Sequence, residues 1–354
     1  MNRLVALDQP GGPEFVDRLC RIWDRGDAAF PVDQRLPGPA KQSLFDRFRV
    51  GQLIEPGDAL VIATSGSTGE PKGVVLTHDA VAASALATSQ RLNVTDQDHW
   101  LACLPLSHVG GLSVITRALH TATRLTVLPG FDAGVVNSSD ATLVSLVPTA
   151  LQRVDPTRFR TIVVGGSRPP TDRPTNTVTT YGMTETGSGV VYDRRPLDGV
   201  ELRIIDGEIQ VRGQMLLRCY RDGTDPKVDG WFPTGDLGEI GADGLLSVHG
   251  RADDLIITGG ENVWPEAVEA VLRDHPHIAD VAVVGEPDPE WGEIVSAYVV
   301  PLNPNIRLTL VEVREYVTGR LPGFAAPRRV TNVAVIPRIV VGKVRRVKLI
   351  RQVE

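Results

Sequence analysis

The amino-acid sequence predicts an α/β fold with a large N-terminal α/β domain, a β-rich subdomain and a small α+β C-terminal domain. Short apolar runs alternate with helix-like or glycine-bearing stretches in the first half of the chain, which is typical of a mostly parallel sheet. Alternating segments separated by Asp-Gly turns then indicate antiparallel strands, and a separate helix–strand pattern follows. The length of 354 residues also suits two domains rather than one.

The predicted elements of the large domain follow from apolar spacing. Apolar side chains at helical spacing predict a helix over 14–25, and Thr77 or Asp79 is a suitable N-cap for a helix over 80–91. Apolar runs that are too short for helices predict strands. These runs lie at 59–63, 74–76, 100–104, 125–128, 142–147 and 161–164.

The rest of the chain shows two patterns, an antiparallel β region and then a mixture of helices and strands. Antiparallel strands are predicted over 199–249, and we place the domain boundary between residues 250 and 251. The sequence therefore divides into domains of 1–250 and 251–354. In the second domain, Asn262 and Pro265 open a predicted helix, and Thr309 caps another. Its predicted elements are helices over 266–273 and 310–321 and strands over 279–284, 294–300 and 330–336.

The composition excludes several classes of protein. A formal net charge of -6 and a pI near 5.7 argue against nucleic acid as a partner, because phosphate binding needs a basic surface. Three distant cysteines exclude a disulfide framework and a cysteine-rich zinc cluster. The first residues lack the apolar core of a signal peptide, and no apolar stretch is long enough to span a membrane. We therefore expect a cytoplasmic protein.

The strongest chemical signal lies in the glycine-rich turn between the strands at 59–63 and 74–76. Its glycines allow backbone N–H groups to surround phosphate oxygens, its hydroxyls add donors, and Lys72 adds a positive charge. Pro71 stands where a Walker A loop needs its second glycine, so a Walker A loop is excluded. The candidate phosphate ligands are Thr64, Ser65, Gly66, Ser67, Thr68, Gly69 and Lys72.

Four later segments carry weaker signals. Thr184 and Glu185 supply hard oxygen ligands for Mg²⁺ on a triphosphate, and Tyr181 offers a flat face for a base. Asp236 follows a tight turn, where a carboxylate can accept hydrogen bonds from ribose hydroxyls. Taken alone, each segment is more typical of a turn or a solvated surface. The remaining two segments are 250–262 and the basic stretch 337–346.

In this order, the five segments resemble the adenylate-forming superfamily, which includes acyl- and aryl-CoA synthetases, adenylation domains of peptide synthetases and luciferases. The resemblance covers the chain from about residue 60 to its end. It implies ATP, Mg²⁺ and the co-substrate CoA, an ATP- and acid-binding adenylation domain, and a mobile C-terminal domain with a catalytic lysine. Three features depart from the family pattern: a shortened N-terminal portion, Ser107 in place of a common aromatic residue, and Cys219 in place of a common glycine.

The resemblance implies a role for each matching residue. Lys343 would be the catalytic lysine of the mobile domain, and Thr184 and Glu185 would act in catalysis and bind Mg²⁺. The hinge would be Asp253, and the CoA tunnel would be lined by Gly259 and Gly260. Besides the 64–72 turn, the ATP-binding residues would be Gly165, Gly166, Ser167, Tyr181, Gly182, Asp236 and Arg251.

The segment from Leu104 to Leu112 is similar to the acyl-pocket segment of o-succinylbenzoate–CoA ligases, a branch of the superfamily that serves menaquinone biosynthesis. The implied reaction converts o-succinylbenzoate, ATP and CoA to o-succinylbenzoyl-CoA, AMP and diphosphate through an acyl-AMP intermediate. His108 would meet a substrate carboxylate, wall the pocket or serve as a core histidine. The implied pocket residues are His108, Val109, Gly110, Gly111 and Ser188, and candidates for a second substrate carboxylate are Arg194, Arg195 and His108.

Two alternatives stay open. The chain is also compatible with a CoA ligase or a stand-alone adenylating enzyme for another fatty, aryl or amino acid. A non-catalytic adenine-nucleotide sensor is the alternative outside the enzymes, and Lys343, Glu185 and Asp236 argue against it. The expected partners are a small carboxylic acid, ATP and CoA, and the sequence is compatible with a homodimer.

Overall fold

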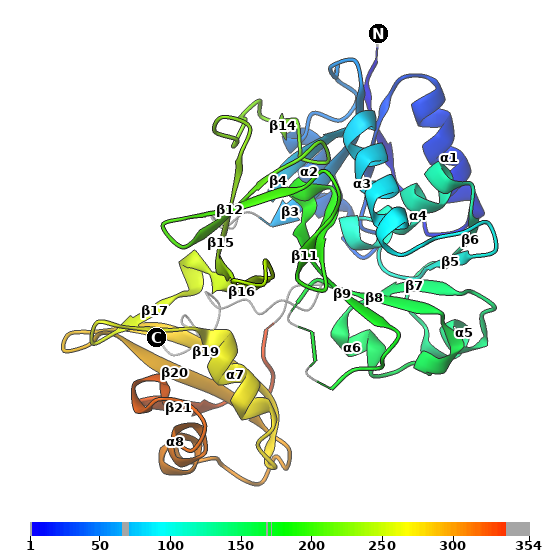
Figure 1. The fold of residues 1–354 in the computed structure, drawn as a ribbon. Coiled ribbons are helices and arrows are strands. Elements are labelled where there is room, and N and C mark those ends of the chain that lie inside the picture. Colours follow the sequence, from blue (N-terminus) through cyan, green and yellow to red (C-terminus); the bar gives the residue numbers. More distant parts are fainter. Residues whose placement is uncertain (1, 66–70, 168, 171, 338–354) are drawn as a thin grey trace. The chain divides into compact units, whose positions relative to one another are not determined.

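The computed structural model describes residues 2–65, 71–167, 169–170 and 172–337 (Figure 1). These residues form two compact units. Unit 1 comprises residues 2–203, 210–233 and 241–246, and unit 2 comprises residues 204–209, 234–240 and 247–337, within the described ranges. A domain boundary between residues 250 and 251 stays a prediction. No helix of the described residues is long and apolar enough to cross a membrane.

The first sheet of unit 1 has five strands in the order β1–β2–β3–β4–β14. The first three run parallel, whereas β4 pairs antiparallel with both β3 and β14. Phe30 and Phe48 pack edge to face in its core, with their ring centroids 5.3 Å apart. The elements are β1 (Leu4–Leu7), α1 (Pro13–Asp24), β2 (Ala28–Pro31), α2 (Gly38–Arg47), β3 (Asp58–Ser65), β4 (Pro71–Thr77) and β14 (Cys219–Tyr220).

The second sheet of unit 1 has seven strands in the order β11–β10–β9–β8–β7–β5–β6. The pairs from β6 to β9 are parallel, which confirms the predicted α/β core, and β10 returns antiparallel beside β9. The strands are β5 (His99–Ala102), β6 (Arg124–Val127), β7 (Leu143–Leu146), β8 (Thr161–Val164), β9 (Thr177–Met183), β10 (Ser188–Tyr192) and β11 (Arg195–Pro196).

Helices cover both faces of this sheet. Alternate residues such as Leu101 and Val144 pack with Val136 of α5 and Ala150 of α6. Trp100 faces the other way, toward Arg117 of α4, which lies beside α3 (Figure 1). The helices are α3 (His78–Arg91), α4 (Val109–Thr121), α5 (Ala133–Ser138) and α6 (Pro148–Leu151), followed by the 3₁₀ turn η1 (Pro156–Arg158).

The predicted cap of the helix at 80–91 is correct. The Thr77 side chain accepts a hydrogen bond from the Ala80 N–H at 3.1 Å, so this residue satisfies a backbone donor at the start of α3. The β-rich region predicted over 199–249 also exists. Its four-stranded sheet has the order β12–β13–β15–β16. The strands are β12 (Glu201–Ile205), β13 (Glu208–Arg212), β15 (Phe232–Ile240) and β16 (Leu246–Arg251).

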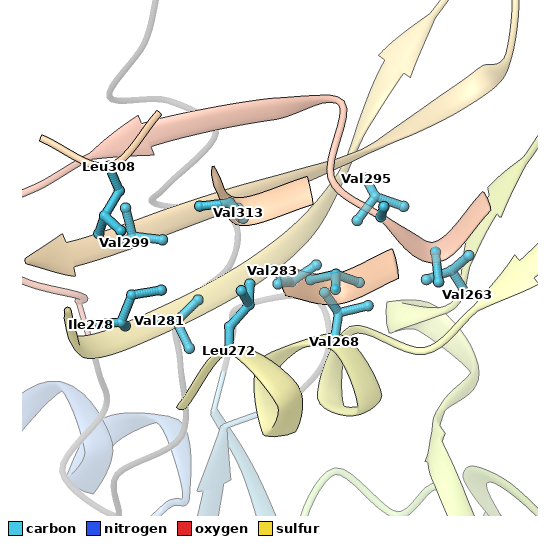
Figure 2. Close-up of a cluster of buried hydrophobic side chains, with 14 of the residues drawn as sticks. Val263, Val268, Leu272, Ile278, Val281, Val283, Val295, Val299, Leu308 and Val313 are labelled. Atoms are coloured by element: carbon cyan, nitrogen blue, oxygen red, sulfur yellow. The ribbon is translucent and has the colours of Figure 1, made fainter. Parts of the chain in front are cut away.

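Unit 2 contains a five-stranded sheet with two helices on one face. Side chains from α7, α8, β19 and β20 meet in one apolar cluster, of which Figure 2 shows Val268, Leu272, Val283, Val299 and Val313. The order is β18–β17–β20–β19, with β21 parallel to β20. The elements are η3 (Ala252–Asp254), β17 (Ile256–Thr258), β18 (Glu261–Val263), α7 (Pro265–Arg273), β19 (Ile278–Asp288), β20 (Gly292–Pro301), α8 (Leu310–Thr318), η4 (Gly323–Ala325) and β21 (Arg329–Asn332).

The two helices of unit 2 had predicted starts, of which one is correct and one is wrong. Thr309 caps α8 as predicted, because its hydroxyl accepts from the Glu312 N–H while the Glu312 carboxylate accepts from the Thr309 N–H. The assignment of Asn262 to the start of α7 was wrong. Asn262 lies in β18 opposite Ile257, and Trp264 is the residue before the first turn.

Candidate functional site

The predicted phosphate-binding turn connects β3 and β4 as an antiparallel hairpin. The ladder runs up to the pairs Thr64–Lys72 and Ser65–Pro71. Gly66, Ser67, Thr68 and Gly69 lie outside the described residues, so their proposed role stays a prediction. The ammonium of Lys72 lies over the aromatic ring of Tyr220, 4.8 Å from its centroid.

Tyr220 connects this hairpin to the predicted metal-binding residue. It is buried in β14, which pairs with β4 so that Tyr220 lies opposite Val74. Its hydroxyl donates a hydrogen bond to Glu185 Oε1 at 3.2 Å. The structure therefore brings Lys72 and Glu185 to one aromatic side chain, although they are far apart in the sequence.

Thr184 and Glu185 lie in the short 3₁₀ turn η2 (Thr184–Thr186) between β9 and β10. The Thr186 hydroxyl accepts from the Met183 N–H at 2.9 Å, and Leu217 N–H donates to the Glu185 carbonyl at 2.8 Å. These bonds fix the turn from two sides. The Glu185 side chain is buried, and Thr184 is half-buried.

The residues predicted around adenine lie at the ends of two neighbouring parallel strands. Gly165, Gly166 and Ser167 follow β8, and Tyr181 and Gly182 belong to the end of β9. A Cβ atom on Gly165 would lie 2.7 Å from the Thr180 methyl group, so the close approach of the two strand ends requires glycine. The carboxyl ends of parallel strands are where open α/β sheets bind ligands.

His108 lies immediately before α4, and its Nε2 atom is buried without a hydrogen-bond partner among the described residues. Burial is the largest cause of a lowered pKa of His108; Asp33 opposes the shift and Arg35 adds to it. A buried ring nitrogen without a protein partner is available for a hydrogen bond to a ligand, as donor or acceptor according to its tautomer. A Cβ atom on Gly111 would lie 2.5 Å from the Pro105 carbonyl oxygen, so glycine allows α4 to pack against this segment.

The rest of the predicted acid pocket lies on two elements. Val109 and Gly110 form the first turn of α4, and Ser188 begins β10. The candidates Arg194 and Arg195 are both exposed at the hairpin between β10 and β11. Their proposed contact with a second carboxylate stays a prediction.

Arg117 is a functional candidate that the sequence reasoning missed. It is 2% exposed, and its guanidinium donates to Ser188 Oγ at 2.7 Å and to Tyr192 Oη and Ser145 Oγ, both at 3.3 Å. No carboxylate pairs with it among the described residues, and its Nε–H has no partner there. A charged residue inside the apolar run from Leu112 to Leu119 was the available signal.

Unit 2 holds the residues predicted to bind ribose. Arg251 Nη1 donates to Asp236 Oδ1 at 3.1 Å and to the Thr234 carbonyl at 2.7 Å. The Asp236 side chain is buried, whereas Arg251 is partly exposed. The two residues therefore form one preorganised group on neighbouring strands β15 and β16.

The other predicted residues of unit 2 lie in turns. Asp253 belongs to η3, which Leu255 separates from β17. Gly259 and Gly260 form the two-residue turn between β17 and β18, with φ values of 58° and 83°. Both angles lie in the left-handed region, which favours glycine. Lys343 lies outside the described residues.

Two protein-family domains match this chain. Residues 17–221 match the AMP-binding enzyme family, and residues 267–343 match the AMP-binding enzyme C-terminal domain. A probable 2-succinylbenzoate–CoA ligase of Mycobacterium tuberculosis is 38% identical over 343 residues, covering 88% of each chain. The 2-succinylbenzoate–CoA ligase of Bacillus anthracis is 33% identical over 387 residues, covering 95% of this chain and 79% of that one.

Solved structures show the same fold. The o-succinylbenzoate CoA synthetase from Bacillus subtilis, in complex with the acyl-adenylate intermediate OSB-AMP, matches with a TM-score of 0.88 at 27% identity. The match covers 98% of this chain and 88% of that chain. The same enzyme with ATP and a magnesium ion matches with a TM-score of 0.84 at 26% identity, again covering 98% and 88%. The chain therefore belongs to the AMP-binding enzyme family, within the adenylate-forming superfamily.

Proposed function

We propose that the chain is an ATP-dependent acid–CoA ligase that converts o-succinylbenzoate, ATP and CoA to o-succinylbenzoyl-CoA, AMP and diphosphate in menaquinone biosynthesis. Membership of the AMP-binding enzyme family supports the adenylating chemistry. Relatives named 2-succinylbenzoate–CoA ligase, which are 38% and 33% identical to this chain, support the choice of acid. The observation in the structure that carries the substrate class is Arg117, a buried guanidinium without a carboxylate partner among the described residues.

Arg117 is suited to the second carboxylate of a dicarboxylic acid. A buried charge is costly unless it is paired, and the described partners of Arg117 are neutral hydroxyls. A guanidinium also matches the planar geometry of a carboxylate. One of the hydroxyls belongs to Ser188, which follows η2 by two residues, so this anchor lies close in the chain to Glu185.

The reaction needs two displacements. In the first, a carboxylate oxygen of the acid attacks the α-phosphorus of ATP; the new O–P bond forms, and diphosphate leaves with the electron pair of the broken bond. In the second, the CoA sulfur attacks the carbonyl carbon and AMP leaves, while the thiol proton passes to solvent. An anion must approach a polyanion in the first step, so positive charge at the phosphates lowers its barrier.

Glu185 and Thr184 fit a magnesium ion. Both offer hard oxygen atoms, and Glu185 is a buried carboxylate that forms no ion pair with a described Lys, Arg or His. When bound, Mg²⁺ would neutralise charge on the triphosphate. We assign the 64–72 turn and Lys72 to the phosphates, Gly165–Ser167 with Tyr181 to adenine, and Asp236 with Arg251 to the ribose. Gly182 is assigned to ATP binding.

In the second unit, we assign Lys343 to adenylate formation, Asp253 to the hinge and the Gly259–Gly260 turn to the passage of the CoA arm. Glycines suit that passage because they bring no side chain close to a narrow ligand. His108, Val109, Gly110, Gly111 and Ser188 are assigned to the acid pocket. These roles remain proposals.

An acid panel tests the function. Pyrophosphate release is measured with o-succinylbenzoate, benzoate, a fatty acid and amino acids, each with and without CoA, and the thioester is identified by mass. We expect release to be greatest with o-succinylbenzoate and to yield its CoA thioester. Preference for a monocarboxylic or amino acid would contradict the proposed acid, and acid-independent ATP binding alone would favour the sensor.

Separate half-reactions test the assignment of Lys343. Lys343→Ala is expected to lose acyl-AMP formation by about 100-fold or more, because one charge that stabilises the transition state is removed. The same variant should still convert supplied acyl-AMP and CoA to thioester. An equal loss in both half-reactions would contradict a lysine that serves only the first step.

A further inference from the structure

Tyr220 is placed between two charges that the proposed function assigns to the nucleotide. Its ring receives the Lys72 ammonium on one face, and its hydroxyl donates to Glu185 Oε1 at 3.2 Å. Tyr220 is 8% exposed and Glu185 is 9% exposed, so their hydrogen bond lies largely out of water, while Lys72 is half-buried. Hydrogen bonds to a charged group contribute more than neutral ones, and cation–π contacts strengthen when they are desolvated.

Sheet register fixes this arrangement. Tyr220 lies opposite Val74 in the β14–β4 pair, and Lys72 is two residues before Val74 on the same face of β4. Lys72 and Tyr220 are therefore diagonal cross-strand neighbours, within reach of long and aromatic side chains. The Leu217 N–H bond to the Glu185 carbonyl holds the turn η2 against the segment that leads into β14.

Tyr220 contacts Lys72 through its ring and Glu185 through its hydroxyl. The described residues show no ion pair between Lys72 and Glu185, although both contact Tyr220. A direct Lys–Glu pair would neutralise both groups and leave neither available to a triphosphate or its cation. A tyrosine can satisfy both charges without carrying a charge itself, because its ring face is negative and its hydroxyl is a donor.

We propose that Tyr220 is a positioning residue of the nucleotide site, which separates Lys72 from Glu185 and orients the Glu185 carboxylate for the magnesium ion of MgATP. This inference rests on the proposed adenylating function. Tyr220 itself touches neither the reacting phosphorus nor the acid in this account. Its hydroxyl acts through Glu185, and its ring acts through Lys72.

The two parts of Tyr220 can be tested separately by measuring ATP affinity by calorimetry with Mg²⁺ and with a chelator. Tyr220→Phe keeps the ring but removes the hydroxyl, so the Kd for ATP with Mg²⁺ should rise about 10-fold, while the Kd in chelator should change less than about 2-fold. Tyr220→Leu also removes the ring, so it should weaken ATP binding under both conditions.

Tyr298→Phe is the matched control. Tyr298 is also buried and donates to a buried glutamate, Glu286 Oε1, at 2.7 Å, but it lies in the sheet of unit 2 and has no proposed role. The control should leave both affinities unchanged. Equal losses in the Tyr220→Phe and Tyr298→Phe proteins, or an equal loss for Tyr220→Phe with and without Mg²⁺, would overturn the inference.

A double-mutant cycle with Glu185→Ala gives a second test, in which a thermal melt first shows that each variant is folded. The Glu185→Ala protein should show the same Mg²⁺-specific loss, and adding Tyr220→Phe to it should cause no further loss, because the hydroxyl then has no carboxylate to orient. Additive losses would overturn the inference. A wild-type protein that binds MgATP but activates no acid would contradict the proposed function alone.

Discussion

Two arginines of unit 1 have opposite surroundings. Arg218 forms two parallel hydrogen bonds with Asp58, at 2.8 and 2.9 Å, and the Asp58 side chain is only 1% exposed. Arg117 is more deeply buried, yet its described hydrogen-bond partners are the hydroxyls of Ser145, Ser188 and Tyr192. The buried carboxylate of Asp58 is therefore satisfied within the fold, whereas the buried guanidinium of Arg117 lacks a counter-charge among the described residues.

The difference separates a structural ion pair from the proposed carboxylate site. Asp58 lies at the start of β3, so its pair with Arg218 ties this strand to the segment before β14. A similar pair joins Arg160 to Asp98, with bonds of 2.8 and 2.9 Å. Arg117 has no such aspartate partner among the described residues, and the proposed dicarboxylic substrate would supply the missing anion.

The largest effect is expected on stability from Arg218→Met. This change leaves Asp58 buried without its cation, so the free energy of unfolding should fall by about 3 kcal/mol. Chemical denaturation measures the change. A loss below about 1 kcal/mol would show that Asp58 does not depend on Arg218, and the contrast with Arg117 would disappear.

Arg117→Met should have the reverse profile. Its kcat/KM for o-succinylbenzoate should fall roughly 100-fold, because a buried charge pair with the substrate is lost. Stability should change by about 1 kcal/mol or less, since an unpaired buried charge is replaced by an apolar chain of similar length.

A substrate comparison serves as the control for this variant. The control substrate is an analogue of o-succinylbenzoate that lacks the carboxylate on the benzene ring and keeps the succinyl carboxylate. Its kcat/KM should be the same for the wild-type and Arg117→Met proteins. If the variant loses activity equally on both acids, Arg117 supports the general structure of the pocket and does not recognise a second carboxylate.

A smaller effect is expected on the pH dependence of stability. It concerns His108, which lies immediately before α4. Burial lowers the pKa of His108 from its ordinary value of 6.5, so the unfolded chain binds a proton there more readily than the folded chain. Stability present above pH 6.5 should therefore be lost as the pH falls below it. His108→Asn should reduce this acid-side loss, which denaturation curves from pH 7.5 to 5 would show. Burial also lowers the pKa of His78 and His275, so part of the loss should remain.

Local features of the fold were predictable from the sequence. The helix cap at Thr77 and the capping box of Thr309 with Glu312 depend on residues three positions apart, so their pattern is visible in the chain. The prediction that Asn262 opens a helix was wrong. Asparagine is a common capping residue, and Asn262 lies three positions before Pro265. Pairing with Ile257 instead places Asn262 in a strand.

The parts of the site that the sequence did not reveal depend on contacts between distant segments. Tyr220 belongs to a two-residue strand without periodicity of its own, and its two partners lie 35 and about 150 positions away. The hydroxyls around Arg117 come from β7 and β10. Only the order of strands in the sheets places these groups together. The family pattern, in contrast, predicts a role for each matching residue from its local motif alone.

The β3–β4 hairpin has a consequence for engineering. Its ladder extends to Ser65 and Pro71, so the sheet fixes the two anchor points of the connection between them. Substitutions in that connection should change the affinity for the triphosphate of ATP without altering the register of the strands. Under the proposed phosphate-binding role, we therefore expect such variants to change nucleotide affinity more than thermal stability.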